Sequence, residues 1–304
     1  MKILVTGSTG LVGAALVDAL GREGHMVCRL IRPGTADKKE SAKGFDVAWD
    51  PATGELGGAG VGPDAVVNLA GASIADGRWT AERKALLRSS RIDTTRALVN
   101  ALAKMNARPR VLISASATGI YGDRGNELLT EDSPLGDGFL SSLARDWEVE
   151  ALKAEALGIR VVLARFGIIL AKHGGALPAM LLPFRLGFGG RIATGQQWMS
   201  WITLDDVIGL LRFAIESNAA RGAINVVAPT AVQNAEFTKV LASALHRPAL
   251  FPAPAFALRI ALGEMADALL LSSQRVVPQR LAQLDYRFLH ADLRSALLAV
   301  LEAS

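Results

Sequence analysis

Three glycines, Gly7, Gly10 and Gly13, lie between the first apolar run of the chain and the first helical pattern. At such a junction the first glycine permits a tight turn, the second lets the main chain approach a pyrophosphate, and the third lets the helix pack against the strand. The spacing therefore predicts dinucleotide binding, with a purely structural turn as the alternative, and the lack of a following Gly-Lys-Ser or Gly-Lys-Thr excludes a P-loop. The residues expected to contact the dinucleotide here are Gly7, Thr9, Gly10, Leu11, Val12 and Gly13.

The end of the second apolar run indicates which dinucleotide would bind. An acidic residue there would accept a hydrogen bond from a ribose 2′-hydroxyl, whereas an arginine would pair with a 2′-phosphate. The run ends at Arg32, and the first acidic residue after it is Asp37. We therefore expect NADP(H) rather than NAD(H), with Arg32 as the phosphate ligand and Arg29 as a weaker second candidate; an ordinary solvated arginine is the alternative.

Strand patterns and helix patterns alternate through the first two thirds of the chain. Such alternation is typical of a parallel sheet with helices on both faces, so we expect an α/β fold built on a Rossmann-like, doubly wound parallel sheet. The stretch 34–63 is expected to be mostly irregular, with one short strand at 47–49. Strands are predicted at 3–5, 26–31, 64–69, 111–115, 159–166 and 223–227, and helices at 11–20, 79–105, 139–157 and 204–216.

A change in amino-acid composition after Gly167 predicts a second, smaller region. Glycines and prolines become frequent between 173 and 190, which indicates loops that a regular sheet would not tolerate. We expect an NADP-binding domain at 1–170, rejoined by about 204–228, and a mostly helical substrate or lid region at 171–304. Its C-terminal segment, 248–304, carries helical patterns at 256–271, 278–284 and 291–301.

Composition excludes several classes of protein. The 304 residues are 50% hydrophobic, which rules out a disordered chain, and 33 basic against 29 acidic residues leave +4 spread without a basic block, so no nucleic-acid partner is expected. The single cysteine, Cys28, cannot form an internal disulfide, and the four histidines lie too far apart in sequence for a zinc site. We see neither a secretion signal nor a membrane-spanning run, and therefore expect a cytoplasmic protein with no metal and no membrane contact.

Three motifs in order resemble those of short-chain dehydrogenases/reductases, especially the extended, epimerase-like branch. They are the glycine loop, Asn68-Leu69-Ala70-Gly71 after the third predicted strand, and the run 114–122 after the fourth. More closely, the whole chain resembles the NADP-dependent, nucleoside-diphosphate-sugar epimerase-like family whose members carry a C-terminal domain of unknown function. That likeness rests on the segments 182–187, 198–206 and 276–280.

The resemblance implies a set of cofactor contacts beyond the glycine loop. Residues of the second motif pass under the cofactor, Arg91 faces the nicotinamide side, and two isoleucines after the fifth strand line the nicotinamide end. The residues implied in this way are Leu69, Ala70, Gly71, Arg91, Ser114, Ala115, Ile168 and Ile169.

The catalytic residues are where this sequence departs from the family pattern. Hydride-transferring members use a Ser or Thr after the fourth strand to bind the substrate oxygen, a role that Ser116 fits, and a Tyr-x-x-x-Lys on the next helix to move the proton. In that helix this sequence has neither Tyr nor Lys at 139–148. Tyr121 is the one nearby phenol and is a candidate proton donor, with plain structural packing as the alternative.

Two functions remain open on the sequence alone. The first is an NADP(H)-binding oxidoreductase or epimerase-like enzyme acting on an unidentified small molecule. The second is a non-catalytic NADP(H)-binding sensor or interaction protein, which the missing Tyr and Lys favour. Oligomeric state is left open by either hypothesis.

Overall fold

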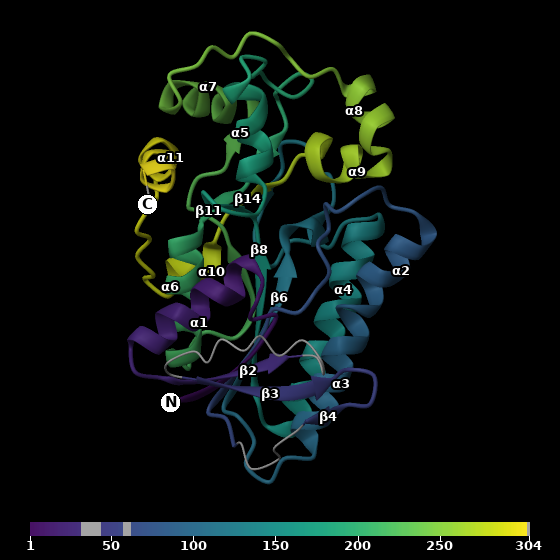
Figure 1. Ribbon diagram of the computed structural model, residues 1–304, viewed down its shortest axis with the longest axis vertical. Helices are drawn as coiled ribbons and strands as arrows, with labels where there is room; N and C mark the ends of the chain where they lie inside the picture. Colours follow the sequence, from purple (N-terminus) through teal and green to yellow (C-terminus); the bar gives the residue numbers. More distant parts are fainter. Residues whose placement is uncertain (32–43, 57–61, 303–304) are drawn as a thin grey trace.

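The computed structural model describes residues 1–31, 44–56 and 62–302 (Figure 1). Within this part of the chain the main sheet has the strand order β12-β8-β6-β5-β1-β2-β3-β4, in which β4 alone is antiparallel to its neighbour. The order reverses between β1 and β5, which is the position where doubly wound sheets bind their ligands. The strands are β1 (Lys2–Thr6), β2 (Met26–Ile31), β3 (Gly44–Asp50), β4 (Glu55–Leu56), β5 (Ala65–Asn68), β6 (Val111–Ala117), β8 (Arg160–Phe166) and β12 (Gly222–Val226).

Helices cover both faces of this sheet (Figure 1). On one face, α1 (Leu11–Arg22) and α6 (Leu204–Glu216) bury their apolar sides, and on the other face α3 (Ile92–Ala103) and α4 (Phe139–Leu152) do the same. The short helix η2 (Lys153–Leu157) extends α4 and ends at Gly158, whose φ of 78° is the left-handed cap that the sequence predicted. The predicted Rossmann-like α/β fold is confirmed.

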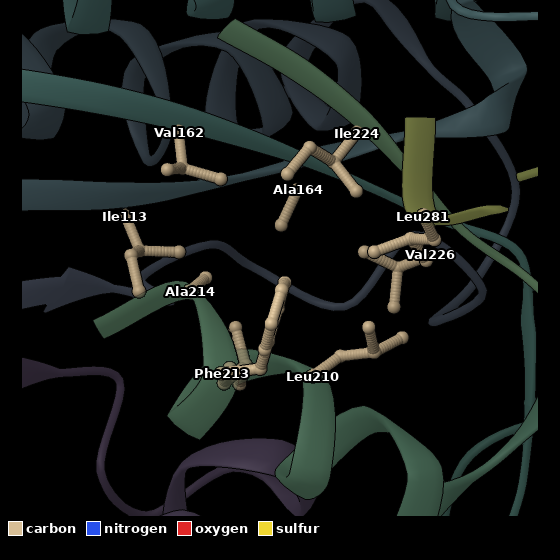
Figure 2. A pocket seen from close by; sticks show the side chains of 10 residues that line it. Ile113, Val162, Ala164, Leu210, Phe213, Ala214, Ile224, Val226 and Leu281 are labelled. Carbon is tan, nitrogen blue, oxygen red and sulfur yellow. The ribbon is translucent and has the colours of Figure 1, made fainter. Parts of the chain in front are cut away.

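The core beneath α6 is closely packed. A residual void of about 10 Å³ lies between β6, β8, β12 and α6, and Figure 2 shows only apolar side chains around it, among them Ile113, Val162 and Leu281. A space this small and apolar holds no ordered water, because no polar partner faces it. Leu281 belongs to α10 (Gln279–Gln283), so the C-terminal segment contributes directly to the core of the sheet.

The prediction of a single long helix at 79–105 is wrong. It is divided into α2 (Ala81–Ser89), capped by the predicted Thr80, and α3, and the break falls at Ser90 and Arg91. Both residues bind the loop that follows β5: the Ser90 hydroxyl accepts from Ala72 N at 3.1 Å, and the Arg91 guanidinium donates to Ala72 O at 2.9 Å. Helical periodicity continues across such a break, so the break is invisible to a pattern search.

The third strand of the sheet is longer than predicted. β3 pairs in parallel with β2 over five positions, and its Asp46 forms an ion pair with Arg29 at 2.7 Å. Among residues 45–50 of β3, whose burial the structure describes, only Val47 and Trp49 are buried. A strand with one buried face alternates in polarity, and this weak pattern predicts only the three-residue strand at 47–49.

The remaining elements form a second region above the carboxyl ends of the strands (Figure 1). Its core is made by α5 (Leu177–Arg185), α7 (Asn234–Ala244) and α11 (Leu293–Glu302) together with short strands. Beside them, α8 (Ala255–Leu262) and α9 (Glu264–Ala266) lead into a π-helical turn, η3 (Asp267–Leu271). The short strands of this part are β9 (Ile168–Leu170), β10 (Trp198–Met199), β11 (Trp201–Thr203), β13 (Val232–Gln233) and β14 (Arg275–Val276). Two further short elements, η1 (Thr118–Tyr121) and β7 (Leu128–Leu129), follow β6 in the chain and belong to the first region.

The predicted C-terminal helices are present with shorter bounds. The pattern at 256–271 is interrupted at Gly263, whose φ of 63° ends α8. None of the described helices is both long and apolar enough to cross a bilayer.

Candidate functional site

A cleft of about 570 Å³ opens at the carboxyl ends of the sheet strands, between the sheet and the second region. It brings together most of the residues that the sequence singled out. Those lining it are Gly7, Gly10, Leu11, Val12, Gly13, Leu69, Gly71, Arg91, Ala115, Ser116, Ile168 and Ile169.

Four predicted residues do not line the cleft, and a fifth lies outside the described residues. Thr9, Ala70 and Ser114 are sequence neighbours of lining residues, and Ser114 is buried in β6, where it accepts from Asn68 Nδ2 at 3.3 Å. Tyr121 is fully buried. Arg32 falls in the segment that the structure does not describe.

The glycine loop has the backbone that a pyrophosphate requires. Gly7 has a φ of 66°, and a Cβ on it would lie 2.5 Å from the Leu69 carbonyl oxygen. A Cβ on Gly13 would lie 2.1 Å from the carbonyl oxygen of Gly7, so this glycine permits the close contact of α1 with the loop. A Cβ on Gly10 would meet nothing closer than 3.4 Å. Gly7 and Gly13 are therefore required by packing, whereas Gly10 leaves the main chain open on the side of the cleft.

A buried polar network holds this loop against the next strand. The Thr6 hydroxyl donates to Asn68 Oδ1 at 2.7 Å and accepts from the Leu69 and Ala70 amides at 3.1 and 3.2 Å. Asn68 Nδ2 donates to the hydroxyl of Thr95 on α3 at 2.8 Å. Because every group is paired, the ends of β1 and β5 are fixed relative to α3.

Arg91 supplies the positive charge of the cleft. Its guanidinium donates to two carbonyl oxygens, of Leu87 and Ala72, and its carbon lies 5.3 Å from the centre of the Trp147 ring, but it has no ion pair with a described carboxylate. Burial, with the like charge of Arg83, lowers the pKa of Arg91 to about 10. A half-buried cation without a counter-ion favours an anionic ligand, so the cleft fits the charge of a phosphorylated dinucleotide.

Ser116 lies at the floor of the cleft and is held from below. Its hydroxyl donates to Glu148 Oε1 at 2.6 Å, and Glu148 in turn receives two hydrogen bonds from Arg165. Burial opposes the charge on Arg165, but the bonds to Glu148 outweigh that effect, and the pKa of Arg165 is raised. A carboxylate in such an ion pair has no proton to give, so the single proton of Ser116 points at Glu148. Toward the cleft Ser116 can offer only lone pairs.

Tyr121 belongs to the support beneath the floor. Its hydroxyl donates to Asn225 Oδ1 at 2.7 Å and accepts from Arg165 Nη1 at 2.8 Å. Burial raises the pKa of Tyr121, with Arg165 acting in the opposite direction. The phenol is thus fully paired, fully buried and away from the cleft, and the geometry favours the structural alternative over the predicted proton donor.

The face of α4 that lines the cleft carries no group that exchanges protons. It presents Leu140, Leu143, Ala144 and Trp147. Leu140 and Ala144 are four residues apart, which is the spacing of the missing Tyr-x-x-x-Lys. Leu143 and Trp147 have the same spacing, so neither described pair on this face of α4 could act as the usual acid/base pair.

Several functional positions were missed by sequence reasoning. Glu148 gave no signal, because an acid in a helix is ordinarily solvated. Trp198 and Trp201 were not missed, since the sequence alone allows such a pair either to wall a substrate cleft or to fill the join between the two regions. Trp198 lines the cleft, whereas Trp201 is buried in the second region. The outer wall combines residues from separate elements of the second region: Met180 on α5, Asn234 at the start of α7, Leu270 in η3 and Gln197 in the loop before β10. Among the described residues no group of three or more His, Cys, Asp or Glu could hold a metal ion.

Comparison with known families divides the chain in two. A model described as the NAD dependent epimerase/dehydratase family matches residues 3–227, which span the whole sheet. A second model, described as a domain of unknown function (DUF1731), matches residues 253–300, from the start of α8 into α11.

Individual relatives match along nearly the full length. The chain is 42% identical over 300 residues to the epimerase family protein YfhF of Bacillus subtilis, covering 98% of this chain and 97% of that protein. It is 38% identical over 305 residues to an SDR39U1 homolog, chloroplastic, of Arabidopsis thaliana, covering 99% and 87%. Among solved structures, the human epimerase family protein SDR39U1 (isoform 2), crystallised with NADPH, matches with a TM-score of 0.86 at 34% identity over 99% of each chain.

Proposed function

The chain belongs to the NAD dependent epimerase/dehydratase family, and from that premise we propose that it is an NADP(H)-dependent oxidoreductase or epimerase-like enzyme acting on a small molecule in the cleft. Family membership confirms the resemblance inferred from the sequence motifs. The observation that carries the proposal is the convergence of the glycine loop, Arg91 and Ser116 on one cleft.

The residues present fit a bound NADP(H). The open main chain at Gly10 and the amides at the start of α1 would hold the pyrophosphate, and Arg91 would supply the positive charge. Arg32 would pair with the 2′-phosphate. When bound, the nicotinamide supplies or accepts the hydride.

Ser116 would orient the reacting oxygen of the substrate. Since its proton is donated to Glu148, its lone pairs accept a hydrogen bond from a substrate hydroxyl. The cleft thus favours the alcohol form of a substrate in the ground state, held beside the nicotinamide by a fixed acceptor.

A non-catalytic NADP(H) sensor is the second candidate, and the apolar face of α4 supports it. Because the described residues of α4 that line the cleft include no side chain that exchanges protons, binding without turnover is physically coherent. In that case, cofactor binding would order the second region and present a surface to a partner.

Calorimetric titration with NADPH and NADH tests the shared part of both functions. We expect NADPH to bind about tenfold or more tightly than NADH, and Arg32→Ala to remove the difference. Equal affinity of the wild type for both dinucleotides would contradict the role of Arg32. No binding of either would contradict the proposed function.

A screen of alcohols and ketones, followed by NADPH absorbance at saturating cofactor, separates the two functions. Specific turnover would reject the sensor, and Ser116→Ala should then lower the rate. Unchanged turnover in Ser116→Ala would remove Ser116 from the mechanism.

A further inference from the structure

We propose that the part of the cleft beyond the cofactor takes an uncharged, mainly apolar molecule bearing a hydroxyl group, and not a nucleoside-diphosphate sugar. This inference rests on the proposed function, because it assumes that NADP(H) fills the part of the cleft beside the glycine loop. It concerns what the opposite wall can bind.

The charge content of the cleft is the first observation. Among the described residues that line it, Arg91 is the only charged one. The guanidinium carbon of Arg91 lies 3.1 Å from the position that a Cβ on Gly71 would take. The charge of Arg91 therefore lies beside the loop after β5, on the cofactor side of the cleft. A second diphosphate would have to leave water for a wall with no cation, which is strongly unfavourable.

The chemistry of the walls is the second observation. On the α4 side, Leu140, Leu143 and Trp147 form an apolar surface, and the second region adds Met180 and Leu270 to the opposite wall. Surfaces of this kind gain free energy by covering carbon rather than hydroxyl-rich sugar rings.

Two amide side chains of the outer wall, those of Asn234 and Gln197, are the third observation, because each is already hydrogen-bonded within the protein. Asn234 Oδ1 accepts from Ile192 N at 2.7 Å, and its Nδ2 donates to the sulfur of Met199. Gln197 Nε2 donates to the carbonyl oxygens of Ile192 and Leu270. These amides brace the wall, and a sugar would have to displace those contacts to be recognised.

Ser116 explains why the proposed ligand carries one hydroxyl group. Ser116 is 2% exposed and lines the cleft, and its hydroxyl proton is engaged in the hydrogen bond to Glu148, so that only its lone pairs remain for a ligand. A hydroxyl of the ligand satisfies this acceptor, whereas a phosphate oxygen would place a second acceptor against it.

Two dyes with the same ring system and different charge test the inference on the NADPH-saturated full-length protein. N-phenyl-1-naphthylamine is neutral, and 1-anilinonaphthalene-8-sulfonate carries one negative charge. We expect the neutral dye to bind with a fluorescence increase, the sulfonate to bind at least about tenfold more weakly, and about 10 mM UDP-glucose, roughly ten times the Kd of a millimolar site, not to displace the neutral dye.

A charge placed in the wall shows whether the dye reports on the cleft. Leu140→Asp puts a carboxylate on the lining face of α4 in its first turn, where the helix dipole favours an acid, so the fold should be retained. It should weaken the neutral dye about tenfold or more. Val149→Asp, at a position 52% exposed on the same helix and outside the cleft, is the matched control and should change nothing.

The outcomes separate this inference from the proposed function. NADPH titration of the same samples comes first, and failure of NADPH to bind contradicts the proposed function. If NADPH binds, then equal affinity for the two dyes, displacement by UDP-glucose, no binding of the neutral dye, or no effect of Leu140→Asp would each overturn the inference alone.

Discussion

The carboxylate of Glu148 on α4 and the guanidinium of Arg165 on β8 form a two-point ion pair beneath the cleft, with N–O distances of 2.8 and 2.9 Å. Both residues are buried, at 6% and 5% exposure. Ser116 and Tyr121 each bind one member of the pair. The pair therefore links the floor of the cleft to the support below it, and its integrity should be visible in stability.

Removing one partner of this pair is expected to be far more damaging than removing both. Arg165→Met leaves a buried carboxylate without its counter-charge and should lower the free energy of unfolding by about 3–5 kcal/mol. The double variant Glu148→Leu/Arg165→Met leaves no orphan charge and should recover part of that loss. Urea unfolding measures both, and equal losses would contradict the interpretation.

Tyr121 should behave as a structural residue. Tyr121→Phe removes a hydroxyl that makes two buried hydrogen bonds and should lower the free energy of unfolding by about 1–3 kcal/mol. NADPH affinity should stay within about twofold of the wild type, because the ring lies outside the cleft. A loss of turnover with unchanged stability would restore Tyr121 as a proton donor.

The glycine loop allows binding to be separated from folding. Gly10→Ala places a methyl group where the main chain is open and φ is −76°, so stability should change by less than about 1 kcal/mol while NADPH binding weakens. Gly13→Ala forces the loop and α1 apart and should weaken both. Thermal unfolding with and without NADPH distinguishes the pair, and a cofactor affinity unaffected by Gly10→Ala would argue for a purely structural turn.

Arg91 should be more important for binding than for stability. Arg91→Met removes a charge that burial disfavours, so the unliganded protein should lose little stability, whereas NADPH affinity should fall about 10–100-fold. Arg96→Met on the same helix removes an outward arginine that pairs with Glu150, and should leave NADPH affinity unchanged. Equal cofactor affinity in Arg91→Met would place the dinucleotide elsewhere.

Stability should decrease in alkaline solution because of the two tyrosines of the chain. Burial raises the pKa of Tyr121, and burial together with Asp206 raises the pKa of Tyr286 to about 12. In the unfolded chain both phenols ionise near pH 10, so the folded state binds more protons between about pH 10 and 12. The stabilising contribution of the phenols to the free energy of unfolding is fully present below pH 10, and that of Tyr286 is lost as the pH rises through about 12. Urea midpoints across this range should fall, and by less in Tyr286→Phe.

The parts of the site that were predictable depend on neighbours in sequence. The three glycines follow a strand and precede a helix within a few residues, and the bounds of α6 at Leu204–Glu216 match the prediction because Thr203 caps it locally. Such signals need only the local chain.

The parts that were not predictable depend on contacts between distant segments. Glu148 and Arg165 look like surface charges until α4 packs on β8. The break at Arg91 arises from the loop around Ala72, and the outer wall of the cleft from segments near Met180 and Leu270. No periodicity records these contacts, because the energy that selects them appears only when the chain is assembled.

The C-terminal segment is attached to the first region by backbone pairing. β14 pairs in parallel with β7, the amide of Val277 donates to the carbonyl of Leu129, and Arg280 donates to Ala223 O on β12. During synthesis residues 275–283 leave the ribosome well after β7 and β12, so the edge at β7 and β12 stays unpaired until they have been made. A nascent chain stalled before residue 275 would expose this edge to chaperones, and we expect protease resistance only in chains that include residues 275–283.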